Sequence, residues 1–176
     1  MPAGDPSFSF QPGPREYGSP TDAHLAFRTA VVEALLPDVS RADLALVWAL
    51  FEAEMACEAA TQQHENLYQI CFYLYELGQL EDVFRLYEAK FLARNMDVGI
   101  TLDREMMTVG HEVAEVRAYA REVFRQQPPL QTRYPTLLQE LDGLVAYPDY
   151  DSLEDYRTFI RGYFYGHEPG DLLPVN

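Results

Sequence analysis

Apolar residues along this chain recur at spacings of three and four, which is the period of an α-helix with one buried face. The clearest run begins after Ser40, and Asp43 follows three residues later as in a weakened capping box. The run contains, in order, Leu44, Val47, Trp48, Phe51 and Met55. This pattern predicts a helix that extends to about Ala60.

Apolar residues with the same period also predict helices around 25–36, 67–77, 80–91, 109–124, 137–144 and 153–164. Thr21 or Asp22 can cap the first of these, and Ser152 with Asp155 can cap the last. Gly78 and Gly166 stand where left-handed C-cap residues belong. Segment 95–102 contains Gly99 and β-branched residues, which predicts a loop or a short extended piece between two helical halves. The expected fold class is all-α, as a compact helical bundle or a short helical-repeat-like array of about six to seven helices.

At 176 residues and 48% hydrophobic, the chain has the length of one domain with one core, which we expect over residues 21–176. Residues 1–20 hold five Pro and three Gly without apolar periodicity, so they predict a flexible N-terminal tail that can lie against the domain through Phe8 and Phe10. The sequence has neither a membrane-spanning apolar run nor a secretory leader pattern, so we expect a cytoplasmic protein. Cys57 and Cys71 fall inside helical patterns, which favours buried free thiols.

Charge is the most informative bulk property, because 28 acidic residues against 13 basic ones give a net charge of −15. Such a surface repels a phosphate backbone, so nucleic-acid binding is disfavoured. Between residues 52 and 88 there are eight acidic side chains and one basic one, and a second acidic group comprises Asp149, Asp151, Glu154 and Asp155. Clusters of this kind either keep helix faces solvated or steer a basic partner protein to its binding surface.

The chemical motifs of enzymes are absent from the sequence, which contains no P-loop, no G-x-S-x-G and no dinucleotide-binding glycine pattern. His111 and Glu115 are one helical turn apart, but the second histidine of HExxH is missing. Glu54 and Glu58, with His64 nearby, could suggest a carboxylate metal site, although the chain contains no Glu-x-x-His. We therefore expect no cofactor and no metal, and keep a small helical metal-dependent enzyme as an alternative.

The stretch from Leu67 to Phe91 resembles one tetratricopeptide-type helical pair. Its matching residues are Leu74, Gly78, Val83, Leu86, Tyr87 and Ala89. The resemblance covers about one repeat unit, and no second copy occurs at that period, whereas solenoids normally need three or more. An ordinary helical hairpin with a glycine C-cap is the simpler interpretation. The resemblance implies, as an alternative function, an adaptor that holds a peptide in a helical groove.

Tyrosines are frequent both in the middle of the chain and near its end, and tyrosine is common where protein surfaces meet. In small size, acidity and interleaved tyrosines the protein resembles bacterial toxin-immunity proteins. That resemblance implies binding to a basic toxin and occlusion of its active surface, with acidic side chains pairing with Lys or Arg and tyrosines acting as anchors. A homodimer through the aromatic C-terminal helix also stays open. The residues predicted to contact the partner are Glu54, Glu58, Glu65, Tyr68, Tyr75, Asp149, Tyr150 and Asp151.

Overall fold

The computed structural model describes residues 6–15, 20–36, 38–146 and 148–166. These residues form an all-α fold, as predicted, with nine α-helices and no strand in the described ranges. The helices are α1 (Leu25–Ala34), α2 (Leu44–Thr61), α3 (Glu65–Leu77), α4 (Asp82–Tyr87), α5 (Met96–Thr101), α6 (Val113–Gln126), α7 (Pro128–Arg133), α8 (Leu137–Ala146) and α9 (Leu153–Tyr165).

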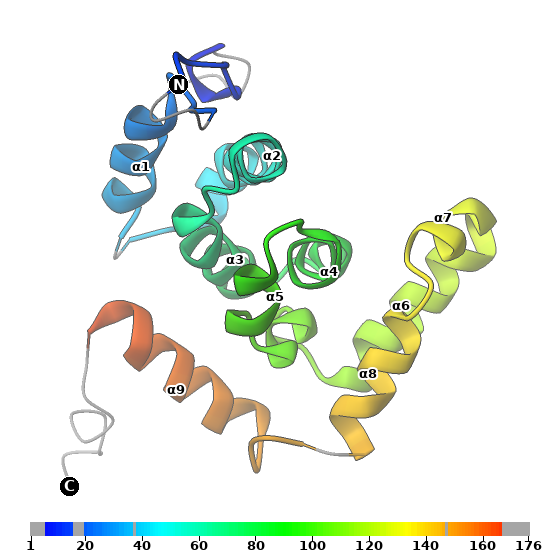
Figure 1. The fold of residues 1–176 in the computed structure, drawn as a ribbon. Helices are drawn as coiled ribbons and strands as arrows, with labels where there is room; N and C mark the ends of the chain where they lie inside the picture. Colours follow the sequence, from blue (N-terminus) through cyan, green and yellow to red (C-terminus); the bar gives the residue numbers. More distant parts are fainter. Residues whose placement is uncertain (1–5, 16–19, 37, 147, 167–176) are drawn as a thin grey trace, which may run out of the picture.

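Helix α3 is the centre of the fold, with α1, α2, α4, α5 and α9 packed around it (Figure 1). Every residue from Ile70 to Leu77 except Glu76 is buried. This helix therefore has no solvent-exposed face over those turns. A helix that is apolar on every side is stable only inside a core. Helices α6 and α8 run side by side as an arm next to this centre, and α7 contacts α6 at the far end of the arm (Figure 1).

Local sequence signals explain several helix ends. At the start of α2, the Asp43 carboxylate accepts hydrogen bonds from the Ser40 N–H at 2.9 Å and from the Ser40 hydroxyl at 2.8 Å, so the predicted capping box forms. The box includes a short 3₁₀ turn, Arg41–Asp43, which leads directly into α2. Gly78 ends α3 and Gly166 ends α9, both with positive φ, as predicted.

The prediction of a loop over residues 95–102 was wrong, because α5 lies there. The Asn95 side chain caps this helix by accepting the N–H of Asp97 at 2.9 Å. Val98, which belongs to α5, is fully buried. The ammonium of Lys90 donates to the carbonyls of Gly99 and Leu102 at the other end. Tertiary contacts therefore override the unfavourable helix propensity of this segment.

Two further boundaries differ from those predicted. The helix expected from Val109 begins only at Val113, because Val109 has a φ of 46° at the end of a 3₁₀ turn, Arg104–Thr108. Pro128 and Pro129 follow the end of α6 and start α7, where the missing proline N–H costs nothing. These short extra helices, α5 and α7, raise the number above the six to seven expected.

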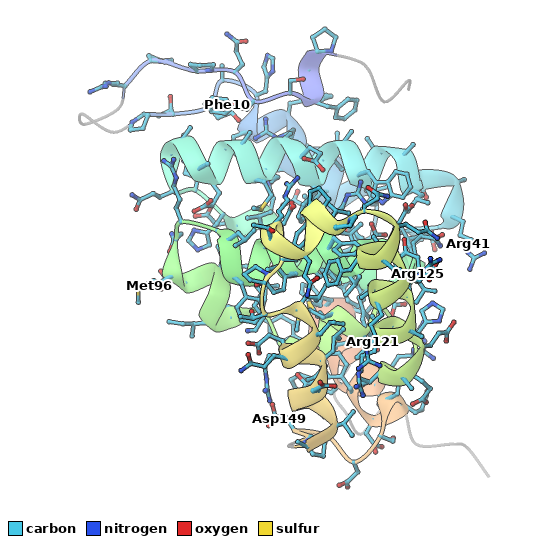
Figure 2. All side chains as sticks on the ribbon, turned by 90° about the vertical axis from the view of Figure 1, so that its right-hand side faces the viewer. Phe10, Arg41, Met96, Arg121, Arg125 and Asp149 are labelled. Carbon is cyan, nitrogen blue, oxygen red and sulfur yellow. The ribbon has the colours of Figure 1, made fainter. Side chains whose placement is uncertain are left out.

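The N-terminal segment lies against the domain over its described residues. A short turn, Pro6–Phe8, contacts α1 and α2, and Phe8 is only 3% exposed while Phe10 is half-buried. In Figure 2 this segment, with Phe10, lies along one edge of the molecule and Asp149 lies at the opposite edge. The prediction of a flexible tail falls partly on residues 1–5 and 16–19, which are outside the described ranges.

Candidate functional site: an acidic cavity at the start of α9

The eight residues predicted to bind a partner do not form one surface in the structure. Glu54, Glu58 and Tyr75 are at most 1% exposed, so they cannot contact a partner, and this part of the prediction was wrong. Glu65 is exposed at the start of α3, and the half-buried Tyr68 lines a small apolar cavity elsewhere. Only the last three predicted residues, Asp149, Tyr150 and Asp151, come together, and they line one cavity.

Glu54 is buried because it completes an ion-pair network. Its Oε1 accepts a hydrogen bond from Arg28 Nε at 2.6 Å and another from Asn66 at 3.1 Å. Arg28 also donates to Asp22 at 2.6 Å, and the side chains of all three charged residues are inaccessible to solvent. Burial tends to raise the pKa of Asp22, but the hydrogen bonds from Arg28 and from backbone N–H groups outweigh burial and lower it. This network joins α1, α2 and α3 to the N-terminal segment.

Glu58 and Tyr75 are also structural. Glu58 Oε1 accepts the backbone N–H of Asn95 at 2.6 Å, which ties α2 to the start of α5. The ring of Tyr75 meets the ring of Tyr156 edge to face, with centroids 5.5 Å apart, and burial raises the pKa of Tyr75 to about 12. A helical period identifies one face of a helix but does not show whether that face is buried. The sequence therefore did not show that Glu58 and Tyr75 are internal.

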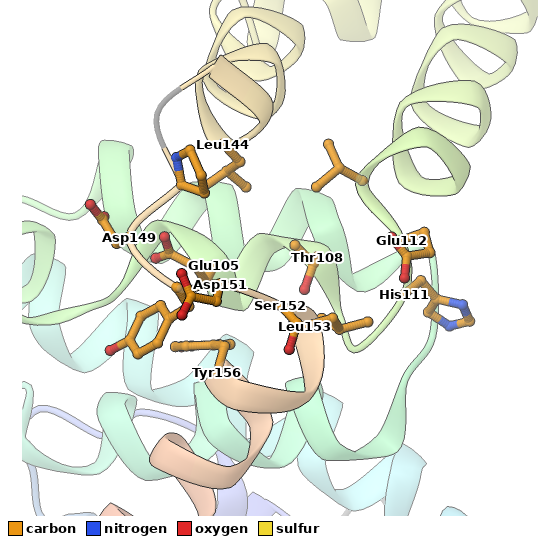
Figure 3. Close-up of a pocket in the computed structure, with 13 residues that line it drawn as sticks. Glu105, Thr108, His111, Glu112, Leu144, Asp149, Asp151, Ser152, Leu153 and Tyr156 are labelled. Carbon is orange, nitrogen blue, oxygen red and sulfur yellow. The ribbon is translucent and has the colours of Figure 1, made fainter.

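The cavity lies between the 3₁₀ turn Arg104–Thr108, the first residues of α6, the end of α8 and the start of α9, and its volume is about 180 Å³. Asp149, Tyr150 and Asp151 come from the loop between α8 and α9. Glu105 and Thr108 come from the 3₁₀ turn, where a spacing of three residues places both side chains on the same face. Figure 3 shows Glu105, Asp149 and Asp151 on one side of the cavity, Thr108 in the middle, and His111 with Glu112 on the other side.

Two residues that line the cavity each have a buried oxygen atom without a hydrogen-bond partner: Glu105 Oε1 and Thr108 Oγ1. Thr108 as a whole is 4% exposed. Burial, followed by the negative charges of Asp149 and Asp103, raises the pKa of Glu105 above its usual value. Two buried oxygen atoms at the inner end of the site therefore have no hydrogen-bond donor.

The pKa values of the two tyrosines beside these carboxylates, Tyr150 and Tyr156, are also raised. Burial, together with the charges of Asp103, Glu105 and Asp149, raises the pKa of Tyr150 to about 12, and burial is also the main cause that raises the pKa of Tyr156. The rings of these two tyrosines have centroids 4.9 Å apart. One compensating cation is present at the mouth, where Arg104 Nη2 lies 3.3 Å from Asp149.

The start of α9 fixes the orientation of the acidic loop. Ser152 caps the helix by accepting the N–H of Asp155 at 3.1 Å, and its hydroxyl donates to the Asp155 carboxylate at 2.7 Å. This is the predicted cap, and it places Glu154 and Asp155 in the first turn, where the helix dipole favours negative charge.

The histidines are engaged in local contacts. His111 Nε2 lies 2.9 Å from the Gly78 carbonyl, to which it donates, and Nδ1 lies 3.2 Å from Glu115. His64 is close to Asn95 and Gln62, whereas Glu54 and Glu58 are bonded elsewhere. Within residues 6–15, 20–36, 38–146 and 148–166, no three His, Cys, Asp or Glu side chains are grouped as a metal ion would require.

A second, smaller cavity of about 150 Å³ lies on the other half of α9. It is lined mainly by apolar side chains, including the half-buried Tyr68 and the exposed Phe159 and Tyr163. Sequence reasoning did not identify Glu105 or Thr108, because nothing in the sequence shows that the 3₁₀ turn meets the loop before α9.

Searches against protein-family models, curated proteins and solved structures give no match. In the part of the chain that the structure describes, no helix has the length and apolar character needed to cross a bilayer. The function must therefore be inferred from the geometry of the chain itself.

Proposed function

We propose that the protein is an acidic, cytoplasmic protein-binding module whose partner is a basic protein, and that its binding face surrounds the cavity at the start of α9. One observation carries the proposal. Six exposed carboxylates lie on the segments that form the mouth of this cavity, and they belong to Glu112, Glu115, Asp149, Asp151, Glu154 and Asp155.

The basic side chains near this face do not cancel its charge. Arg104 lies beside Asp149, and Arg157 is held between Glu154 at 3.4 Å and the Gly110 carbonyl at 3.0 Å. A single-sign patch of this kind attracts an oppositely charged protein and speeds its association. Binding would occlude the basic surface of the partner, as the resemblance to toxin-immunity proteins implies, and the partner would then be a toxin or effector.

The adaptor alternative has less support. Helices α3 and α4 do form a hairpin that turns at Gly78, but most of α3 is buried, so this hairpin offers no open groove to a peptide. Self-association through Phe159 and Tyr163 on α9 is a separate alternative, and light scattering of the purified protein distinguishes a homodimer from a monomer.

A tagged pull-down from native cells at low and high salt tests the proposal. We expect one basic partner at near-equal stoichiometry, with recovery falling as salt rises because exposed charges are screened. The variant Asp149→Asn/Asp151→Asn removes two charges from the cavity mouth. The matched control Glu33→Gln/Asp38→Asn removes two exposed charges from elsewhere on the chain. Equal recovery of a partner by both variants, or recovery of no basic protein, would contradict the proposal.

A further inference from the structure

The inner wall of the cavity has unsatisfied hydrogen-bonding capacity that the fold itself does not use. Thr108 Oγ1 and Glu105 Oε1 are both buried and have no partner, and Thr108 is 4% exposed. A buried polar atom without a partner is destabilising, and native proteins leave few of them. Both residues line the cavity, so two such atoms on one face of one 3₁₀ turn indicate a position for a ligand.

The carboxylates of the wall favour a ligand that is a cationic hydrogen-bond donor. A carboxylate oxygen only accepts hydrogen bonds, and a threonine hydroxyl can accept one. Asp149 and Asp151 add further acceptors from a second segment, the loop before α9, on the same side of the cavity as Glu105 (Figure 3). The raised pKa of Glu105 reflects its burial first and then the negative charges of Asp149 and Asp103.

The acceptors stand on two different elements, which favours a planar group with donors on several edges over a point charge. A guanidinium presents five N–H donors in a fixed plane and stacks on aromatic faces, whereas an ammonium presents three donors at one atom. Tyr150 and Tyr156 provide aromatic rings in the same cavity. The volume of about 180 Å³ suits a single side chain and not a folded segment.

We propose that this cavity is an arginine-binding pocket, in which the guanidinium of one partner arginine donates to Glu105 and Thr108 at the inner end and to Asp149 or Asp151 at the mouth. That the arginine belongs to a protein rests on the proposed function. The pocket itself rests on the two unpartnered oxygens and is tested without any partner.

The test is an NMR titration of the full chain with methyl-labelled threonine. The probes are N-acetyl-arginine methylamide, the corresponding lysine compound, and the citrulline compound, which has nearly the shape of arginine but no charge. We expect the arginine probe to shift the Thr108 methyl signal saturably. We expect the lysine probe to bind at least about threefold more weakly, because a planar guanidinium can donate two parallel hydrogen bonds to a carboxylate whereas an ammonium acts as a point charge. The citrulline probe should leave the Thr108 signal unchanged.

Two conservative variants locate the binding atoms. Thr108→Val keeps the shape of the side chain and removes the unpartnered hydroxyl, and Glu105→Gln removes the inner charge. We expect Glu105→Gln to raise the Kd of the arginine probe roughly tenfold and Thr108→Val to raise it by a smaller factor, whereas the exposed control Glu33→Gln leaves it unchanged. Unchanged circular dichroism shows that each variant is folded, and the three probes on the wild-type chain provide a measurement that does not depend on the variants.

Three outcomes would overturn the pocket: equal affinity for arginine and lysine, a Thr108 methyl signal that does not move when the arginine probe is added, or an unchanged Kd in both inner variants, which would mean that only water fills the inner end. The proposed function fails separately, when the pull-down recovers no basic partner. An arginine-specific shift of Thr108 together with an empty pull-down would support the pocket and contradict the protein partner.

Discussion

Arg28 Nε lies 2.6 Å from Glu54 Oε1 in a site where neither side chain is accessible to solvent. A second nitrogen of Arg28, Nη2, lies 2.6 Å from the Asp22 carboxylate. One guanidinium therefore joins α1, α2 and the segment that precedes α1. Removing one member of such a network leaves a buried charge without its counter-charge, which costs more than the pair itself contributes.

We therefore expect Glu54→Ala to lower the free energy of unfolding by roughly 3–5 kcal/mol. Glu33→Ala, which removes an exposed carboxylate from α1, should change it by less than about 0.5 kcal/mol. Urea unfolding followed by circular dichroism measures both. A loss of similar size in the two variants would show that the Arg28 network is not needed for the fold.

Asp82 should make stability depend on pH. Its carboxylate is inaccessible to solvent, accepts hydrogen bonds from Trp48 Nε1 and Arg85 at 2.8 Å, and has one oxygen without a partner. Burial raises its pKa to about 6, although Arg85 and the hydrogen bond from Trp48 act in the opposite direction. Because the folded pKa is higher than the unfolded one, the folded state binds more protons between pH 4 and 6. Stability from this group is present below pH 4 and is lost as pH rises through 6.

The comparison of wild type with Asp82→Asn isolates this effect, because Asn cannot titrate. From pH 4 to pH 7.5 we expect wild type to lose on the order of 2 kcal/mol relative to the variant. Trp48 is the single tryptophan of the chain, so its fluorescence reports both unfolding and the titration of its hydrogen-bond partner. An identical pH profile for the two proteins would show that folding does not change the pKa of Asp82.

Gly78 holds the turn between α3 and α4 at a φ of 64°, where a β-carbon is strained. We expect Gly78→Ala to destabilise the protein by about 1–2 kcal/mol. Gly143 lies inside α8 with ordinary contact distances around its position, so Gly143→Ala should instead stabilise the protein by roughly 0.5–1 kcal/mol. Thermal unfolding of the two variants should therefore move in opposite directions, and a shared direction would contradict the assignment of the turn.

Phe8 tests whether the N-terminal segment belongs to the domain. Its side chain is 3% exposed and contacts the ring of Phe27 at a centroid distance of 5.4 Å. We expect Phe8→Ala to cost about 3 kcal/mol, because the substitution leaves a cavity, and Phe10→Ala, at a half-buried position, to cost clearly less. Equal and negligible losses would mean that residues 6–15 do not contribute to the stability of the core.

Local patterns in the sequence were sufficient for much of the fold. The capping box at Ser40 and Asp43, the cap at Ser152 and the glycine ends at Gly78 and Gly166 all depend on contacts within a few residues, and all form as predicted. Segment 95–102 could not be predicted in this way, since α5 depends on Lys90 and on the burial of Val98.

The candidate site also combines features that the sequence predicted with features that only the structure shows. By itself, the sequence determined the all-α class, most helix positions and the acidic group around Asp149 and Asp151, because periodicity, capping and charge are local properties. Only the tertiary structure decided that Glu54 and Glu58 are buried and that Glu105 and Thr108 meet the loop before α9. Burial and convergence depend on how distant segments pack, and a helical repeat defines a face without specifying what covers it.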